Sequence, residues 1–307
     1  MTSLRIAIIA GHSSTTAGKR TPPFFNPIDV DGDGSYDIQV GEQYREHYAN
    51  VGVALKFDEA LRRCGFETAK IGWDDADATN DTLNDDSAGL AKRQSLVKAN
   101  SCDYLVSIHF NACGDGATFN TATGICTYYH NIASRAGDSA LLASHIQGQI
   151  INGTKQYNRG IYSAGFAEVN CQAMGVKAAV LIELAFMTNQ VEAETMMANE
   201  QYWIESAEEI CRALCSYTGV TYVQREDEDD MIRYKKLEKI PNDCGFRDII
   251  GYLMDAQILK GDGSDPTGNN DIIDLSHDQV RTLVLEYRGG AFDRKLISMG
   301  MEPVITI

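Results

Sequence analysis

Short apolar runs alternate with longer amphipathic stretches over the first two thirds of the chain. Five runs are short and rich in β-branched or aromatic residues, as is typical of buried strands; they cover residues 4–10, 66–71, 104–110, 125–129 and 178–184. Apolar residues at helical spacing predict helices over residues 42–63, 87–100, 134–151, 191–197 and 200–217. This alternation predicts an α/β fold with a mixed, mostly parallel twisted sheet and helices on both of its faces.

The pattern changes beyond the last of these helices. Five consecutive acidic residues at 226–230 are typical of a solvated linker. An amphipathic helix at 246–259 and a turn region at 262–271 follow, and Ser276 and Gln279 form a capping box that begins another helix. We therefore expect a first domain at residues 1–219, an acidic linker at 220–242 and a small, mainly helical domain at 243–307.

The charge of the chain restricts its partners. It has 27 Lys and Arg against 43 Asp and Glu, a net charge of -16 at pH 7, and both predicted domains are acidic. Because phosphate binding needs positive charge, we expect neither nucleic acid nor an anionic membrane surface as a partner. The longest apolar runs are far shorter than the about 20 residues that span a bilayer. The first residues also lack the apolar segment of a signal peptide, so we expect synthesis in the cytoplasm without one.

The eight cysteines are irregularly spaced, with no Cys-x2-Cys pair. We therefore expect most of them to be free thiols in the core, where cysteine behaves as a small apolar residue. Cys211 and Cys215 lie four residues apart in a predicted helix and share one of its faces.

Two histidines follow or end predicted buried strands. His12 comes one glycine after the run at 4–10, and His109 lies next to the end of the run at 104–110. Ligands of open α/β sheets lie at the carboxyl ends of the strands, so these imidazoles can converge on one point. Neutral imidazoles suit zinc, and a catalytic zinc has about three protein ligands. Glu46 and His47, near the start of the first long helix, are the candidates for the third.

Glu183 lies inside the apolar run that begins at residue 178. A carboxylate there is costly unless it is paired, binds a metal or reaches the exposed end of the strand. An apolar pocket would raise its pKa, which suits a general base near neutral pH. A strand-end residue that caps a loop is the structural alternative.

Five separated blocks of this chain resemble one enzyme family. They are AGH at 10–12, GKRTP at 18–22, REHYAN at 45–50, SIHFNA at 107–112 and LIELAFMTNQVE at 181–192. In this order they resemble the zinc-dependent N-acetylmuramoyl-L-alanine amidases of the type 3 amidase family. The resemblance implies His12, Glu46 and His109 as zinc ligands and Glu183 as the catalytic base. It also leads us to expect substrate contacts from Arg93 and Asn111.

The reaction that the resemblance implies is hydrolysis of the amide between N-acetylmuramic acid and L-alanine in peptidoglycan. A cytoplasmic enzyme of this kind would be a phage or prophage endolysin that reaches the wall through a holin-type hole. Two alternatives stay open from the sequence: a non-catalytic wall-binding protein on an amidase fold, and a zinc peptidase with another substrate.

Two further segments carry weaker signals. The acidic loop Asp29–Asp37 has a spacing similar to that of an EF-hand calcium loop, but Val40 stands where the final Glu ligand belongs. We therefore expect a polar turn beside the substrate groove, with calcium binding as the alternative. The last 65 residues resemble, more weakly, the helical tails of clostridial phage lysins and S-layer-homology-type repeats, which implies wall binding or homo-oligomerisation.

Overall fold

The structure is a computed structural model, and it describes residues 3–73, 89–131, 136–154, 156–225, 233–242, 245–260 and 272–304. The chain forms two compact units, Met1–Val223 and Gln224–Ile307. The predicted acidic run at 226–230 and the turn region at 262–271 lie outside the described residues. In the part of the chain that is described, no helix is both long enough and apolar enough to cross a membrane.

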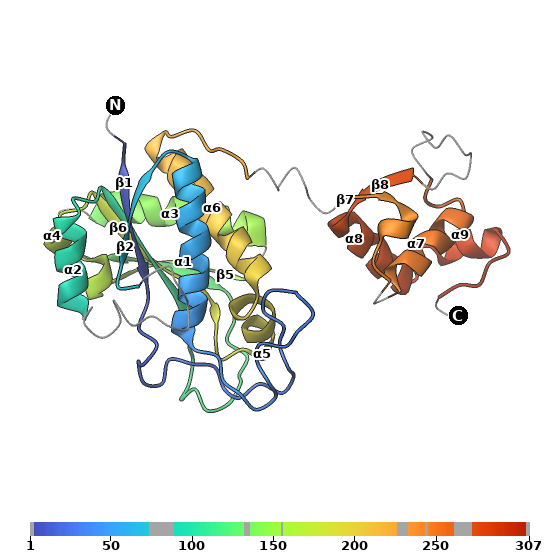
Figure 1. Ribbon diagram of the computed structural model, residues 1–307, viewed down its shortest axis with the longest axis horizontal. Coiled ribbons are helices and arrows are strands. Elements are labelled where there is room, and N and C mark those ends of the chain that lie inside the picture. Colours follow the sequence, from blue (N-terminus) through green and yellow to red (C-terminus); the bar gives the residue numbers. More distant parts are fainter. Residues whose placement is uncertain are drawn as a thin grey trace. The chain divides into compact units, whose positions relative to one another are not determined.

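The first unit is built on a six-stranded sheet with the order β2-β1-β3-β6-β4-β5 (Figure 1). Its strands are β1 Arg5–Ala10, β2 Glu67–Ile71, β3 Tyr104–Asn111, β4 Ile125–His130, β5 Asn158–Ala164 and β6 Ala178–Phe186. The first four in the order run parallel, and β4 pairs antiparallel with β6. This confirms the mixed, mostly parallel sheet.

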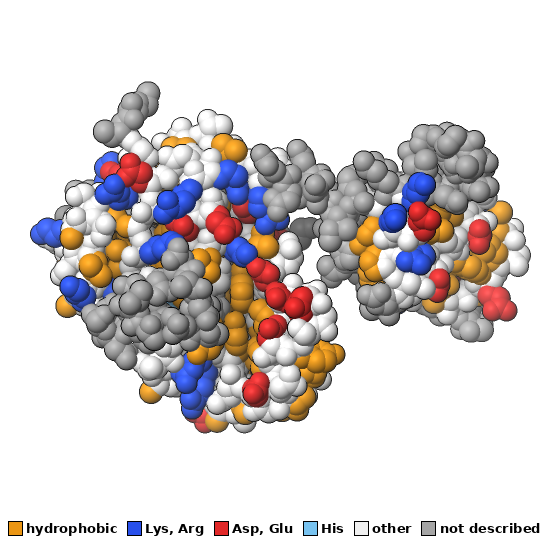
Figure 2. All heavy atoms as spheres, in the orientation of Figure 1, with side chains coloured by type: hydrophobic (Ala, Val, Ile, Leu, Met, Phe, Trp, Pro, Cys, Tyr) orange, Lys and Arg blue, Asp and Glu red, His pale blue; other side chains and the backbone are white. Residues whose placement is uncertain are grey.

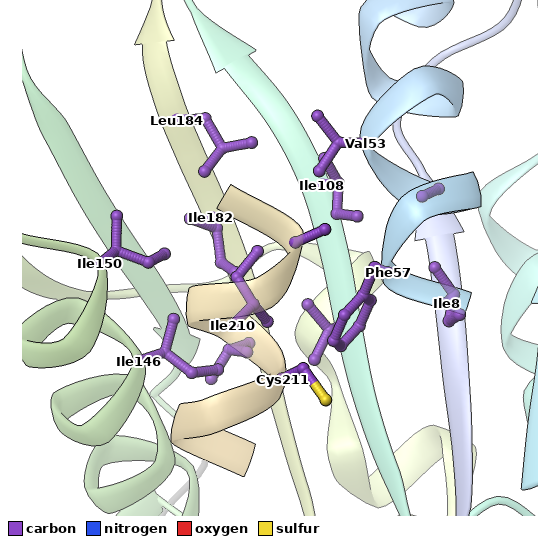
Figure 3. Packing of buried hydrophobic residues seen from close by; sticks show 14 of the residues in the cluster. Ile8, Val53, Phe57, Ile108, Ile146, Ile150, Ile182, Leu184, Ile210 and Cys211 are labelled. Carbon is purple, nitrogen blue, oxygen red and sulfur yellow. The ribbon is translucent and has the colours of Figure 1, made fainter. Parts of the chain in front are cut away.

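Helices cover both faces of this sheet (Figure 1). One face packs against α1 Glu46–Arg63, α3 Ala136–Thr154 and α6 Glu200–Thr218; the other packs against α2 Leu90–Ala99 and α4 Cys171–Met174. Figure 3 shows the larger core, where Phe57 of α1 and Ile210 of α6 meet Ile108 and Ile182 of the central strands. The apolar runs are therefore buried from both sides, as the sequence predicted.

The sequence missed one strand of the sheet and misplaced several helix ends. β5 is an edge strand whose residues are mostly exposed, so its sequence lacks the apolar alternation of a strand. The first helix begins at Glu46 rather than at residue 42, because residues 42–45 pair with the loop after β1. The predicted helix at 191–197 is a short helical turn, α5 Gln190–Glu192, followed by a π-helical turn, η3 Ala193–Met197.

The second unit has its own apolar core. It contains β7 Arg233–Lys236, η5 Leu237–Lys239, α7 Phe246–Asp255, β8 Ile272–Ser276, α8 His277–Arg288 and α9 Asp293–Ser298. The two strands pair antiparallel. Ile250 and Leu253 of α7 pack with Val280 and Val284 of α8, so this small unit is mainly helical, as predicted.

Charged side chains of both signs are mixed on the face of the protein that Figure 2 shows. The Lys and Arg side chains that are described there are scattered among Asp and Glu and form no continuous basic stripe on that face.

Candidate metal centre

The carboxyl ends of β1 and β3 meet the start of α1, and this brings three metal-binding side chains together. His12 follows β1, His109 lies near the end of β3, and Glu46 is the first residue of α1. One ligand atom from each lies within 4.8 Å of the other two. The structure thus brings together the three residues that the sequence picked out as ligands.

Glu46 lies between the two imidazoles. Its Oε1 is 3.2 Å from Nδ1 of His109, and its Oε2 is 3.3 Å from Nε2 of His12. The two rings meet edge to face, with centroids 4.9 Å apart. Burial alone would raise the pKa of Glu46, but hydrogen bonds from His109 and His12 outweigh it and hold that pKa far below its usual range. Glu46 is therefore an ionised carboxylate.

The backbone before His12 is shaped to admit the His109 ring. A Cβ at Gly11 would lie 2.1 Å from Cε1 of His109, so only glycine fits there. His12 itself has φ 61°, in the left-handed region that few non-glycine residues adopt. Such strain persists only where the surroundings hold it, and Arg93 donates a hydrogen bond to the His12 carbonyl.

The start of α1 is anchored to the same turn. His47 Nδ1 lies 2.8 Å from the carbonyl oxygen of Gly11, and Asn50 Nδ2 donates to that oxygen at 3.0 Å. His47, the alternative ligand, therefore lies against the Gly11 backbone and outside the donor group. The REHYAN block thus has two tasks. Glu46 faces the imidazoles of His12 and His109, while His47 and Asn50 attach the start of α1 to the Gly11 carbonyl.

A buried carboxylate that the sequence did not reveal lies behind His109. Glu168 Oε2 is 2.8 Å from Nε2 of His109, which leaves Nδ1 facing Glu46. Burial lowers the pKa of His109, but the hydrogen bond to Glu168 and its charge outweigh burial and raise it to about 10. A carboxylate on the far nitrogen is the usual way to orient a metal-binding imidazole.

Arg93 connects this carboxylate to His12. Its Nη1 lies 2.8 Å from Oε1 of Glu168 and donates to the Ala10 carbonyl at 3.2 Å. Only 4% of Arg93 is exposed. This corrects the expectation of direct substrate contact, because the guanidinium is used up on buried groups. Arg93 instead fixes the positions of His12 and Glu168.

Glu183 lies beside the donors on the neighbouring strand. It is level with His109 in the β3–β6 register and is the only residue of β6 that is not fully buried. Its Oε2 is buried and has no hydrogen-bond partner. Burial raises the pKa of this carboxyl to about 8. A largely buried carboxyl with such a pKa can take up and release a proton near neutral pH.

The three donors fit a zinc ion. Two imidazoles and one carboxylate are a common catalytic zinc set. Oε2 of Glu46 is buried and faces only His12 Nε2, at 3.3 Å, and the Lys19 ammonium, at 3.9 Å, so its capacity to accept is not filled by short contacts and a cation could fill it. His12 keeps 21% of its side chain exposed, which leaves one side of the group open to substrate.

Comparison with known proteins identifies the family of the chain. Residues 6–216 match the family model described as N-acetylmuramoyl-L-alanine amidase. The chain belongs to this amidase family. Family membership makes it a hydrolase of the class that acts on cell-wall peptidoglycan. The search of curated proteins found no match.

Solved structures support the same fold. The N-acetylmuramoyl-L-alanine amidase from Clostridium difficile 630 is 26% identical, with a TM-score of 0.53 over 71% of this chain and 98% of that one. The catalytic domain of an amidase from Bacillus (Paenibacillus) polymyxa var. colistinus is 22% identical, with a TM-score of 0.50 over 71% and 99% of the two chains. An amidase from Mycobacterium smegmatis, 18% identical, reaches a TM-score of 0.53 over 70% and 97%.

Two other predicted features of the amidase lie near this edge of the sheet. Asn111 ends β3, two residues after His109, and is half-buried with its Nδ2 3.8 Å from Cys126 Sγ. Its contact with substrate stays a prediction. In the acidic loop, carboxylates of Asp29, Asp31 and Asp37 lie within 4.8 Å of one another, and Asp29 accepts bonds from the amides of residues 32 and 34. The polar turn stays the prediction for this loop, with calcium binding as the alternative.

Proposed function

We propose that this amidase is zinc-dependent and cleaves the amide between the lactyl group of N-acetylmuramic acid and L-alanine. The observation that carries the proposal is the convergence of His12, Glu46 and His109 beside a protonatable Glu183. These are a metal-ligand set and a general base at the carboxyl edge of one sheet, where α/β enzymes bind their substrates.

His12 Nε2, a Glu46 oxygen and His109 Nδ1 would hold the ion. When bound, Zn²⁺ supplies a Lewis acid that polarises the scissile carbonyl and lowers the pKa of water. Glu183 then accepts a proton from the attacking water. As the carbon–nitrogen bond breaks, Glu183 returns that proton to the amine of L-alanine, so the products are a glycan carboxylate and a free peptide amine.

The buried network keeps the ligands in place during these steps. Glu168 accepts from Nε2 of His109, which fixes the tautomer with Nδ1 free to bind. Arg93 holds both Glu168 and the His12 carbonyl. Neither side chain is placed to contact substrate, so we assign both as positioning residues.

Digestion of purified Gram-positive peptidoglycan tests the bond that is cut. The proposal predicts new L-alanine amino termini and no new reducing sugar ends. Reducing ends would indicate a glycosidase, and amino termini from residues other than L-alanine would indicate a peptidase. If neither product appeared on several wall types, a non-catalytic wall-binding role would replace the proposal.

We also propose that the enzyme acts as an endolysin. Cutting this bond detaches the peptide cross-links from the glycan, which is sufficient to weaken the wall. Expression in a bacterium, alone and together with a membrane-permeabilising holin, tests the cellular role. We expect lysis only when the holin is present; lysis by the enzyme alone would contradict release through a hole.

For the second unit we propose wall binding, with homo-oligomerisation as the other expected role. The unit has its own core, so it is a compact body distinct from the catalytic unit. Co-sedimentation of the full chain with intact walls should decrease when the chain is shortened to residues 1–223. The other role would be favoured if the pellet fraction stayed unchanged while the full chain was an oligomer in solution and the shortened chain a monomer.

A further inference from the structure

The end of α1 opposite Glu46 carries a second group of metal-binding atoms. Cys64 directly follows α1, and Cys211 and Cys215 lie one turn apart on α6. The three Sγ atoms lie within 4.8 Å of one another, and those of Cys64 and Cys211 are 3.6 Å apart. Figure 3 shows Cys211 beside Phe57, at the packed interface of α6 and α1.

This grouping differs from the ordinary burial of single cysteines that the sequence led us to expect. Cys102, Cys126 and Cys171 are also buried, but none of them belongs to a group of three metal-binding side chains among the described residues. The three clustered cysteines have exposed fractions of only 7%, 0% and 1%. Residues that are 147 positions apart in the sequence thus place their sulfurs in contact.

We propose that Cys64, Cys211 and Cys215 form a second metal site, separate from the amidase centre, that binds a soft thiophilic cation such as Zn²⁺ or Cu⁺. Thiolates select ions of this class. A zinc–sulfur bond of about 2.3 Å places two sulfurs of a tetrahedral site about 3.8 Å apart. The 3.6 Å contact between Cys64 and Cys211 is close to that separation, so these two side chains need little movement to bind one ion.

Hydrogen bonds among the three sulfurs lower the pKa of one of them. A hydrogen bond from the Cys211 thiol lowers the pKa of Cys215, and the bond from Cys64 and the charge of Arg63 act in the same direction. Burial raises the pKa of Cys64, which keeps its proton until a cation replaces it. Binding therefore exchanges S–H protons, released to the buffer, for metal–sulfur bonds.

The site would act as a structural clamp. Cys64 Sγ accepts a hydrogen bond from the amide of Val223 at 3.3 Å, and Val223 ends the first unit. A bound ion would therefore join the end of α1, the C-terminal half of α6 and the segment that ends the unit. Its enclosure matches structural sites, which are closed, rather than catalytic sites, which keep a position open.

Cadmium titration of the reduced, metal-stripped full chain tests this proposal. Cadmium bound to thiolates gives a charge-transfer absorption band, whereas the imidazole and carboxylate donors of the amidase centre contain no sulfur. We expect a band that saturates at one equivalent per chain and persists in His109→Ala. It should disappear in Cys211→Ser and remain in the matched control Cys102→Ser, which replaces a buried cysteine outside the group.

Two results would overturn the proposal. One is the absence of a thiolate band from the wild-type chain, a result that does not depend on the folding of any variant. The other is a band that Cys211→Ser leaves unchanged while circular dichroism shows that variant to be folded. Zinc should also raise the melting temperature of His109→Ala, because a ligand that binds only the native state stabilises it. This rise should be absent from Cys211→Ser.

Discussion

The two ends of α1 carry two different sets of metal-binding side chains. At its start, Glu46 meets the imidazoles of His12 and His109. Behind them, Glu168 bonds to His109, and Arg93 bonds to Glu168 and to the His12 carbonyl. At its end, Cys64 meets two thiols within the apolar core. In the first set, 21% of the His12 side chain is exposed. In the second set, the exposed fraction of each cysteine is 7% or less.

The difference between these two ends of α1 suits them to different functions, catalysis at the start and stabilisation of the fold at the end. A polar set with an open side and an oriented outer layer can hold a reactive ion and admit substrate. A sulfur set closed on all sides can only hold its ion and the helices around it. One helix thereby links a proposed catalytic site to a proposed structural one, and substitutions at one end should leave the other unchanged.

Glu183→Gln should have the largest effect. The amide cannot accept the proton of the attacking water, so we expect the hydrolysis rate to fall by about 10²–10⁴-fold. Glu183 belongs to neither group of proposed metal ligands, so the metal content of the purified variant should equal that of the wild type. Glu59→Gln, an exposed position on α1, is the control and should keep full activity. Wild-type rates in Glu183→Gln would remove Glu183 as the base.

Gly11→Ala should reduce metal binding only at the site of His12, Glu46 and His109. The new Cβ would overlap the His109 ring and force it out of place. We expect zinc affinity at this site to fall by at least about 100-fold, more than is typical for loss of an outer partner. Competition with a zinc chelator measures the affinity. Gly148→Ala, where a Cβ meets no atom within 4 Å, should behave as wild type. Unchanged affinity in Gly11→Ala would exclude His109 as a ligand.

Glu168→Gln should reduce the zinc affinity of the same site by a smaller factor. The imidazole keeps its place but loses its charged partner, and such losses typically cost about 10–100-fold in metal affinity. Ser107→Ala, which removes only the 3.3 Å bond from the Ser107 hydroxyl to Glu168, should cost less. Equal zinc affinities for Glu168→Gln and the wild type would show that the carboxylate does not orient His109.

The pH profile should show the smallest effect. The pKa of Glu183 is raised by burial to about 8, and a base must be ionised to accept a proton, so activity should rise with pH as the carboxyl ionises. A bound cation favours the ionised form, so the midpoint should lie below 8 in the zinc enzyme. The acid limb of log(kcat/KM) against pH measures it. A profile that is flat through this region would contradict the assigned role.

Much of the fold could be predicted because the central strands β1, β3 and β6 are buried on both faces and are therefore almost uniformly apolar. The same pattern placed His12 and His109 at strand ends, where a parallel sheet brings them to one edge. β5 could not be predicted, because an exposed edge strand carries no such pattern.

One member of each site could not be predicted from the sequence. Glu168 lies in the short 3-10 helix Ala167–Val169, without periodicity, and meets His109 only through the tertiary fold. The spacing of Cys211 and Cys215 was visible, but nothing in the sequence indicated that Cys64 joins them. Such contacts depend on how helices pack on the sheet, which local patterns do not encode.

The most direct test of the central claim is zinc removal and return on peptidoglycan. The wild-type enzyme is stripped with a chelator, assayed for new L-alanine amino termini, and assayed again after zinc is restored, with His109→Ala in parallel. We predict that the stripped enzyme releases none, that zinc restores the wild-type rate and that His109→Ala stays inactive throughout. Full activity of the stripped enzyme, with its metal content shown to be negligible, would contradict a zinc-dependent amidase.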